Sequence, residues 1–325
     1  MISIIGSETL LGRELREGLK EAGFGRGLQL IGAQDELSLS LDTAEPAVIT
    51  PMDAERLQGS DVIFCAGTPD STRKAYDLAG ERPTFIDLTY ALEEIPEARL
   101  RAPMVDTSEV VSRVHVLAHP AATALALMFS HLPGPVKHSV IQVFEPASER
   151  GQAGIHELQQ QTTGLLSFRQ LEKKVFDAQL GFNMLARYGE DAPEQLAIVE
   201  QRIERHLASL LASGGATVPM PSMRLTQAPV FHGYSISFWV EMEQRPELSE
   251  LEKSLASSHI EVRSAELDAP TNVGAAGQRG LIAGEFELDR NHPRGVWMWV
   301  VLDNFRMLVD NAMDVVRVML PGARS

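Results

Sequence analysis

The chain has 325 residues, with 44 acidic and 29 basic side chains and a formal charge of −15 at pH 7. Its length suggests roughly two domains of about 150 residues each, and each could bury its own core. So acidic a surface cannot neutralise phosphates, which excludes nucleic acid as an expected partner. The single cysteine, the lack of a signal-peptide pattern and the lack of a long apolar run favour a cytoplasmic protein without membrane contact.

The first third of the sequence alternates short apolar runs with helical periodicity. We expect strands at residues 2–5, 28–31, 61–65, 84–88 and 114–118, and helices at about 11–22 and 71–78. Repeated alternation of strand and helix is typical of βαβ units and a mostly parallel sheet. Residues 1–125 are therefore predicted to form an α/β domain.

After Pro120 the pattern changes. Helices are predicted at about 121–131, 152–170, 193–213 and 304–320, and strands at 136–144, 233–243, 279–289 and 295–303. Pro193 and Glu194 are expected in the first turn of their helix. We expect residues 126–303 to form an α+β domain with a mostly antiparallel sheet, and the last helix, about 304–325, to pack back onto the first domain.

A glycine-containing turn, Gly6-Ser7-Glu8-Thr9-Leu10-Leu11-Gly12, follows the first strand and opens the first helix. In a Rossmann-type domain the pyrophosphate of a dinucleotide binds at this place. Thr9 replaces the middle glycine and adds bulk, so a tight turn that binds nothing is the alternative. The residues expected around a dinucleotide are Gly6, Thr9, Leu10, Leu11, Gly12, Asp35, Ala66 and Gly67.

Asp35 follows the second strand, where a carboxylate suits a ribose 2′-hydroxyl and repels a 2′-phosphate. NAD is therefore favoured over NADP as the cofactor. The nine histidines show no metal-binding spacing and no second cysteine is present, so no metal is expected. Cys65 lies in an apolar strand and is predicted to be buried and inert. His119 and His232 lie on turn-like segments and are candidate site residues, whereas His206 is expected to pack on its helix.

Five segments carry motifs of one enzyme family. Residues 144–163 read FEPASERGQAGIHELQQQTT, 118–124 AHPAATA, 181–185 GFNML, 228–235 APVFHGYS and 303–306 DNFR. In this order they resemble the segments QAVSGAGKAGxxEL…QT, ANPNCST, AFNVIP, VPVFRGHS and DNLR of the aspartate-semialdehyde dehydrogenase family. The resemblance covers nearly the whole chain, and the combination resembles the USG-type homologues, a side branch of that family.

The resemblance implies a dinucleotide-binding domain and a second domain that supplies the dimer interface and the catalytic residues. It also implies the NADP-dependent reductive dephosphorylation of an acyl phosphate in amino-acid biosynthesis. In that reaction a thiolate attacks the carbonyl and holds the acyl group as a thioester. A histidine acts as base, and basic residues bind the substrate's carboxylate and phosphate.

The positions that carry this chemistry in the family hold other residues here. The nucleophilic cysteine corresponds to Ala122, which has no heteroatom, and the histidine base to Tyr234, with an ordinary pKa of about 10. Glu145 stands in place of the substrate-positioning glutamine, where its charge is expected to oppose an anionic substrate. Gln227 and Glu93 stand in place of two substrate-binding arginines, so the basic residues are lost.

The favoured hypothesis is a homodimer of this scaffold that has lost the family's reaction, a pseudoenzyme that binds a dinucleotide or a protein partner. The alternative is an active oxidoreductase that reduces a carbonyl by hydride transfer without a covalent intermediate, with Glu145, Tyr234 and His232 in its site. A third possibility is a partner-binding subunit that uses neither cofactor nor substrate. In the first two, NAD or NADP is the cofactor, and the small-molecule ligand is not identified by the sequence.

Overall fold

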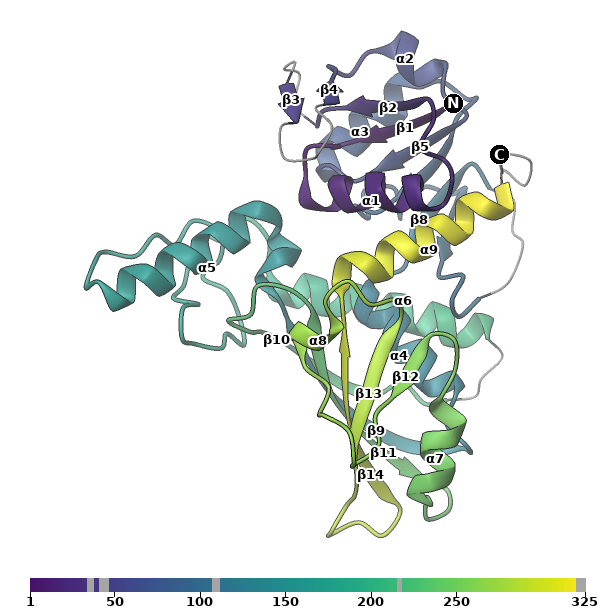
Figure 1. Ribbon diagram of the computed structural model, residues 1–325, viewed down its shortest axis with the longest axis vertical. Coiled ribbons are helices and arrows are strands. Elements are labelled where there is room, and N and C mark those ends of the chain that lie inside the picture. Colours follow the sequence, from purple (N-terminus) through teal and green to yellow (C-terminus); the bar gives the residue numbers. More distant parts are fainter. Residues whose placement is uncertain (34–37, 41–46, 107–111, 215–217, 320–325) are drawn as a thin grey trace. The chain divides into compact units, whose positions relative to one another are not determined.

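A computed structural model describes residues 1–33, 38–40, 47–106, 112–214 and 218–319 (Figure 1). The chain divides into two compact units, Met1–Ala118 with Leu308–Ser325, and His119–Met307. The first unit thus ends before the boundary predicted at residue 125, because the helix that follows packs within the second unit. Among the described residues no helix is both long and apolar enough to cross a membrane.

The first unit is built on a parallel sheet with the strand order β2-β1-β5-β6-β8-β7. Every pairing in this sheet is parallel, which confirms the predicted α/β, Rossmann-like architecture. The elements are β1 (Ile2–Ile5), α1 (Leu10–Glu21), β2 (Leu28–Ile31), α2 (Ala54–Gln58), β5 (Val62–Cys65), α3 (Pro69–Leu78), β6 (Thr84–Asp87), β7 (Ala98–Arg101) and β8 (Val114–Leu117). The short strands β3 (Ser38–Ser40) and β4 (Ala47–Ile49) form a separate antiparallel pair.

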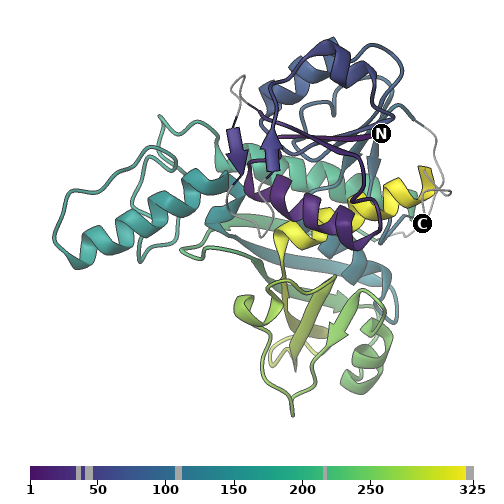
Figure 2. The same ribbon diagram turned by 45° about the horizontal axis from the view of Figure 1, so that its top comes forward.

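The last helix, α9 (Asn304–Met319), supplies apolar residues to the core of the first unit. Its residues from Leu308 onward share a cluster of buried side chains with Leu15 and Leu19 of α1, and the two helices lie side by side in Figures 1 and 2. Gly18 permits this approach, because a Cβ at that position would lie 2.5 Å from Cγ1 of Val309.

The second unit contains a mixed sheet with the strand order β10-β9-β11-β14-β13-β12. The central pairings are antiparallel, but both edge strands, β10 and β12, pair in parallel, so the expectation of a mostly antiparallel sheet is corrected to a mixed one. Neither edge strand was predicted from the sequence. The elements are α4 (Pro120–Ser130), β9 (Val136–Glu145), α5 (Gly151–Leu166), α6 (Leu196–Ser213), β10 (Ser222–Gln227), β11 (Tyr234–Met242), α7 (Leu248–Leu255), β12 (Ile260–Val262), α8 (Asn272–Ala275), β13 (Leu281–Leu288) and β14 (Gly295–Leu302).

Two helices of the second unit are shorter than the sequence predicts. Helix α5 stops at Leu166 instead of residue 170. Two residues later, Phe168 has a positive φ of 54°, which a helix does not allow. Helix α6 begins at Leu196, so Pro193 and Glu194 precede it instead of forming its first turn. Glu194 is held there by ion pairs with Arg150 and Arg202.

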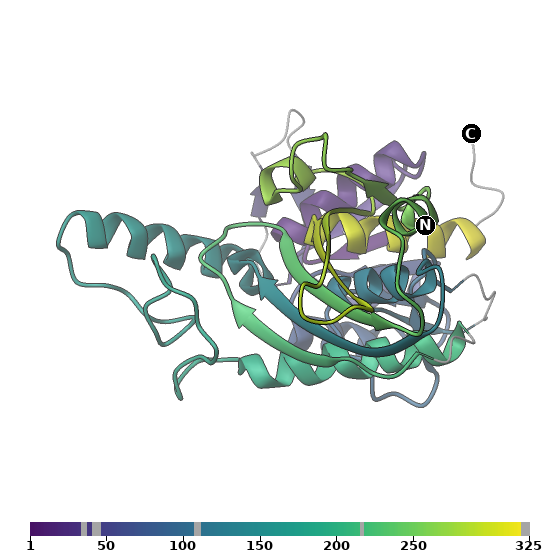
Figure 3. The same cartoon turned by 90° about the horizontal axis from the view of Figure 1, so that it is seen from below.

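Helix α5 projects from the sheet of the second unit, and the segment that follows it folds back along it (Figure 3). Its buried polar residues hold that segment. Glu157 accepts hydrogen bonds of 2.6 Å from the backbone N–H groups of Lys174 and Val175, and Gln161 accepts one of 2.6 Å from that of Leu180. Both belong to the EL…QT motif, so this motif has a structural role in the fold.

Candidate functional site

The turn between β1 and α1 owes its glycines to close packing of the backbone. Gly6 has a φ of +76°, and a Cβ there would collide with the backbone of Gly67 at the end of β5. A Cβ at Gly12 would collide with the carbonyl oxygen of Gly6. These glycines are thus required by the chain itself, whether or not a ligand is bound.

Thr9 caps α1. Its hydroxyl accepts a hydrogen bond of 2.9 Å from the Gly12 N–H and lies 2.8 Å from the carbonyl oxygens of both Gly6 and Ala66. The amides of Leu10 and Leu11, at the first two positions of the helix, have no acceptor within it. An anion such as a pyrophosphate could therefore accept hydrogen bonds at this turn. Asp35 lies outside the described residues.

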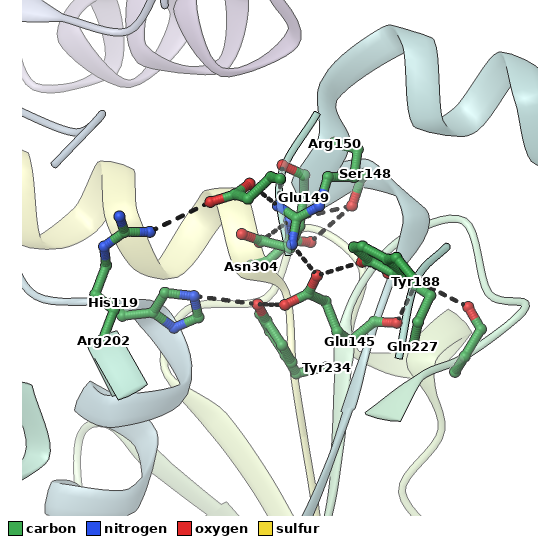
Figure 4. Close-up of polar contacts among 12 residues, drawn as sticks. His119, Glu145, Ser148, Glu149, Arg150, Tyr188, Arg202, Gln227, Tyr234 and Asn304 are labelled. Atoms are coloured by element: carbon green, nitrogen blue, oxygen red, sulfur yellow. Dashed lines mark hydrogen bonds and ion pairs between the residues drawn. The ribbon is translucent and has the colours of Figure 1, made fainter. Parts of the chain in front are cut away.

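The second unit contains a buried cluster of polar side chains centred on Glu145, the last residue of β9 (Figure 4). The Glu145 side chain has no exposed surface and pairs with Arg150 at 2.6 Å. The Tyr234 hydroxyl donates to one of its oxygens at 3.4 Å, and the Tyr188 hydroxyl lies 3.3 Å from the other. Burial raises the pKa of Glu145 above its ordinary value, while the charge of Arg150 opposes this rise.

Arg150 connects several members of the cluster. Its guanidinium reaches Glu194 at 2.9 Å in addition to Glu145, and it lies 5.6 Å from the ring centroid of Tyr188. Arg202 extends the chain of charges to Glu194 at 3.6 Å. The carboxylate of Glu145 is thus paired with a neighbouring cation, a pairing that the sequence left open.

Gln227 is fully buried and hydrogen-bonded within the same cluster. Its Nε2 donates to the carbonyl oxygens of Glu145 at 2.8 Å and of Ala228 at 3.1 Å. Its Oε1 accepts a hydrogen bond of 2.6 Å from the hydroxyl of Tyr188. Both ends of this amide are therefore used by the protein.

Tyr234 and His119 form the other side of the cluster, and both are buried. Nδ1 of His119 accepts a hydrogen bond of 3.3 Å from the Ala121 N–H at the start of α4, so Nε2 carries the proton and faces the Tyr234 hydroxyl at 3.4 Å. Burial holds the pKa of His119 well below its usual range. A chain of donors thus runs from neutral His119 through Tyr234 to Glu145.

Ala122 lies in the first turn of α4 with no exposed surface. The hydroxyl of the adjacent Thr123 is also buried and finds no hydrogen-bond partner in the described part of the chain. Neither residue presents a nucleophilic atom to a ligand.

The remaining candidate residues have other surroundings. The exposed His232 packs its ring against Phe305, with a centroid distance of 6.0 Å. Glu93 belongs to the first unit, where its charge adds to the rise that burial causes in the pKa of Asp87. In the same unit, burial raises the pKa of Cys65 well above its usual range, as expected of an inert thiol.

Glu149 adds a second carboxyl group beside Glu145. It accepts a hydrogen bond of 2.7 Å from Nδ2 of Asn304, and burial, together with the charge of Glu145, raises its pKa to about 7. The motif QAVSGAG has glycine and alanine where this chain has Glu149 and Arg150. Two charged residues in place of small neutral ones could have indicated the cluster from the sequence. Neither of them, nor Tyr188, was among the predicted site residues.

Within residues 1–33, 38–40, 47–106, 112–214 and 218–319, no group of three or more His, Cys, Asp or Glu side chains could hold a metal ion.

Comparison with known proteins places this fold among semialdehyde dehydrogenases. A USG-1 protein homologue from Pseudomonas aeruginosa is 28% identical over 319 residues, covering 94% of this chain and 93% of that protein. An aspartate-semialdehyde dehydrogenase from Synechocystis is 22% identical, covering 94% and 92%. The solved structure of a probable aspartate-semialdehyde dehydrogenase from Pseudomonas aeruginosa is 24% identical with a TM-score of 0.84, covering 99% and 98%. That of the Candida albicans enzyme with NADP is 12% identical with a TM-score of 0.67, with the same coverage.

A family model described as the semialdehyde dehydrogenase dimerisation domain matches residues 127–307. These residues make up more than half of the chain and contain most of the second unit. The chain therefore belongs to the semialdehyde dehydrogenase family.

Proposed function

We propose that this protein is a dinucleotide-binding homodimer that keeps the semialdehyde dehydrogenase scaffold and lacks the family's covalent reaction. The observation that carries the proposal is Ala122, a buried alanine at the position that corresponds to the nucleophilic cysteine. A thioester needs a sulfur atom at that point of the chain, and alanine offers none.

The buried cluster around Glu145 supports this proposal. Tyr234, Glu145 and Gln227, at the positions of the family's base, glutamine and arginine, are buried and bonded to one another or to Arg150 and Tyr188. Side chains that satisfy each other in this way have few hydrogen-bonding groups left for a substrate. The substitutions therefore form a coherent internal network in place of an anion-binding site.

Dinucleotide binding is supported by the first unit. Its sheet is parallel and Rossmann-like, and the turn after β1 leaves the amides of Leu10 and Leu11 without an acceptor in the helix. The similar chain from Candida albicans was solved with NADP. The bound cofactor would offer hydride chemistry; the residues that would hold its phosphates are those of the β1–α1 turn.

Dimerisation is supported by one face of the sheet in the second unit. Val140 and Trp297 on this face are 50% and 41% exposed, and Phe144, Trp239 and Trp299 beside them are only partly buried. All three tryptophans of the chain lie here, on neighbouring strands. An aromatic face of this kind is typical of a protein interface, and the matching family model is that of a dimerisation domain.

A second candidate function is carbonyl reduction with Tyr234 as proton donor. The donor chain from His119 through Tyr234 to Glu145 favours it. The complete burial of Tyr234 weighs against it, because a proton donor must reach the substrate. If this function is correct, Tyr234→Phe abolishes whatever carbonyl reduction the wild type shows; an undiminished rate removes the idea.

The test combines calorimetric titration with an assay. We expect purified protein to bind at least one of NAD, NADH, NADP and NADPH, and to give no turnover above background with aspartate semialdehyde, phosphate and either cofactor. The Ala122→Cys variant should also show little activity, because base and arginines remain absent. Turnover that survives Ala122→Gly would refute the loss of the reaction, and the absence of binding to all four nucleotides would refute the dinucleotide site.

Dimerisation is tested by the molar mass in solution. We expect a dimer for the wild type and a monomer, or a much weaker dimer, for Trp297→Glu. Val273→Glu, at an 89% exposed residue of α8, is the control that should leave the dimer intact. A monomeric wild type would refute the homodimer.

A further inference from the structure

Glu8 reaches from the β1–α1 turn to the end of β2. Its Oε1 accepts a hydrogen bond of 2.8 Å from the backbone N–H of Ala33, two residues beyond the last residue of β2. The side chain therefore places a carboxylate at the carboxyl end of that strand. The sequence does not reveal this, because Glu8 and Ala33 are 25 positions apart.

Two neighbouring contacts show that Glu8 lies where the strand ends converge. The N–H of Gly6 donates to the carbonyl oxygen of Ile31, the last residue of β2, at 2.9 Å. A Cβ on Gly67 would lie 3.0 Å from the Cβ of Ala33. The ends of β1, β2 and β5 thus meet at this turn, on the edge of the parallel sheet where Rossmann-type domains bind the adenosine half of a dinucleotide.

The second carboxylate oxygen of Glu8, Oε2, does not take part in the hydrogen bond to Ala33. Oε2 is buried, and the described residues offer it no hydrogen-bond partner. A buried acceptor without a donor is unfavourable, since it has lost its water without gaining a replacement. A hydroxyl that donates to Oε2 would remove this deficit.

We propose that Glu8 is the residue that selects the unphosphorylated dinucleotide, by accepting a hydrogen bond from the ribose 2′-hydroxyl of the adenosine half. This inference rests on the proposed dinucleotide binding and adds its specificity. A 2′-phosphate at the same point would meet the carboxylate as a like charge. It would also find the Ala33 N–H, its natural donor at the strand end, already occupied by Oε1.

The role assigned to Glu8 is the one that the sequence predicts for Asp35, which lies outside the described residues. An acidic residue that follows β2 in sequence is the usual source of a ribose-binding carboxylate. Among the described residues, the turn that precedes α1 supplies a carboxylate at the end of β2.

The experiment measures the affinities of NAD, NADP, ADP-ribose and 2′-phospho-ADP-ribose by calorimetry for the wild type, Glu8→Gln and Glu8→Ala. Glu17→Gln is the matched control, since it removes the same charge from an exposed position of α1. Glu8→Gln keeps the size of the side chain and an acceptor for the Ala33 N–H, so we expect this variant to fold even if Glu8→Ala does not. Thermal unfolding without ligand verifies that each variant is folded.

We expect the wild type and Glu17→Gln to prefer NAD and ADP-ribose over their 2′-phosphorylated counterparts. Glu8→Gln and Glu8→Ala should reduce this preference by about tenfold or more, the effect of one hydrogen bond to a charged group. A wild type that binds NAD with a preference unchanged in both Glu8 variants would overturn the role of Glu8 and leave dinucleotide binding intact. So would a wild-type preference for NADP. No binding of any of these ligands to any variant would overturn both.

Discussion

Replacing Arg150 by alanine removes the cation that faces the fully buried carboxylate of Glu145 at 2.6 Å. After the change, the described side chains near Glu145 offer the Tyr234 hydroxyl as a donor at 3.4 Å and the Tyr188 hydroxyl at 3.3 Å, whose proton goes to Gln227 at 2.6 Å. Both hydroxyls are neutral and lie at long distances, so they cannot replace a buried ion pair.

The magnitude follows from the burial of the two partners. Removing one partner of a buried ion pair typically costs 3–5 kcal/mol, because the other charge stays desolvated; we expect about 4 kcal/mol for Arg150→Ala. The loss of the contact with Glu194 adds less than about 1 kcal/mol, since that side chain is 36% exposed and retains Arg202. For a unit of this size the sum corresponds to a fall of roughly 10 °C in the unfolding temperature.

The assay is urea unfolding followed by tryptophan fluorescence. All three tryptophans, Trp239, Trp297 and Trp299, lie in the sheet of the second unit, so the signal reports on the part of the molecule that contains the ion pair. The double variant Glu145→Gln/Arg150→Ala is the matched control, because it restores the neutral residues of the QAVSGAG motif. We expect it to recover most of the lost stability, since no uncompensated charge remains.

The cost of Arg150→Ala should also depend on pH. Burial already raises the pKa of Glu145, and loss of Arg150 raises it further. An acid with a folded-state pKa above its unfolded-state value destabilises the fold as the pH rises between the two values, so the cost should shrink as the pH is lowered. A cost below about 1 kcal/mol at neutral pH, or a double variant no more stable than the single one, would refute the buried ion pair.

Two further predictions concern single titratable groups. Because burial raises the pKa of Glu149 from 4.5 to about 7, we expect wild-type stability to fall as the pH rises through that interval, and Glu149→Gln to flatten this dependence in urea unfolding; an unchanged slope would contradict the raised pKa. Cys65 is fully buried with a pKa well above the usual range, so a thiol reagent should modify the protein only after denaturant unfolds it. Rapid modification of the native protein would show that the strand β5 opens readily.

The fold of the first unit was predictable because its strands are short apolar runs that hydrophobic patterning identifies. Residues 2–5 and 62–65 are buried on both faces of the sheet, and apart from Ser3 they are apolar throughout. Strand β7, Ala98–Arg101, alternates apolar and basic residues, but it was missed because four residues with a single large apolar side chain make too short a pattern. Strand β12 has only three residues, which is too few for a periodicity to be recognised.

In the candidate site, some properties follow from the identity of a residue and others from the arrangement of its neighbours. That Ala122 offers no nucleophilic atom follows from its identity, and no arrangement of the chain can change it. Whether the charge of Glu145 is balanced depends on its neighbours: the sequence left this open, and the structure pairs the carboxylate with Arg150 in a buried cluster. Such a pairing depends on how the turn after β9 aims each side chain, which hydrophobic patterning does not encode.

The sequence alone determined the parallel first sheet, the family and the identity of Ala122, on which the proposed loss of the reaction rests, because these depend on residue types and on local periodicity. The fold decided which polar groups face one another. Glu8 reaches Ala33, Tyr234 joins His119 and Glu145, and Gln227 is bonded at both ends of its amide. Each of these contacts joins residues distant in sequence, and their energies depend on burial and on distances of a few ångströms, which arise only when the strands and helices pack together.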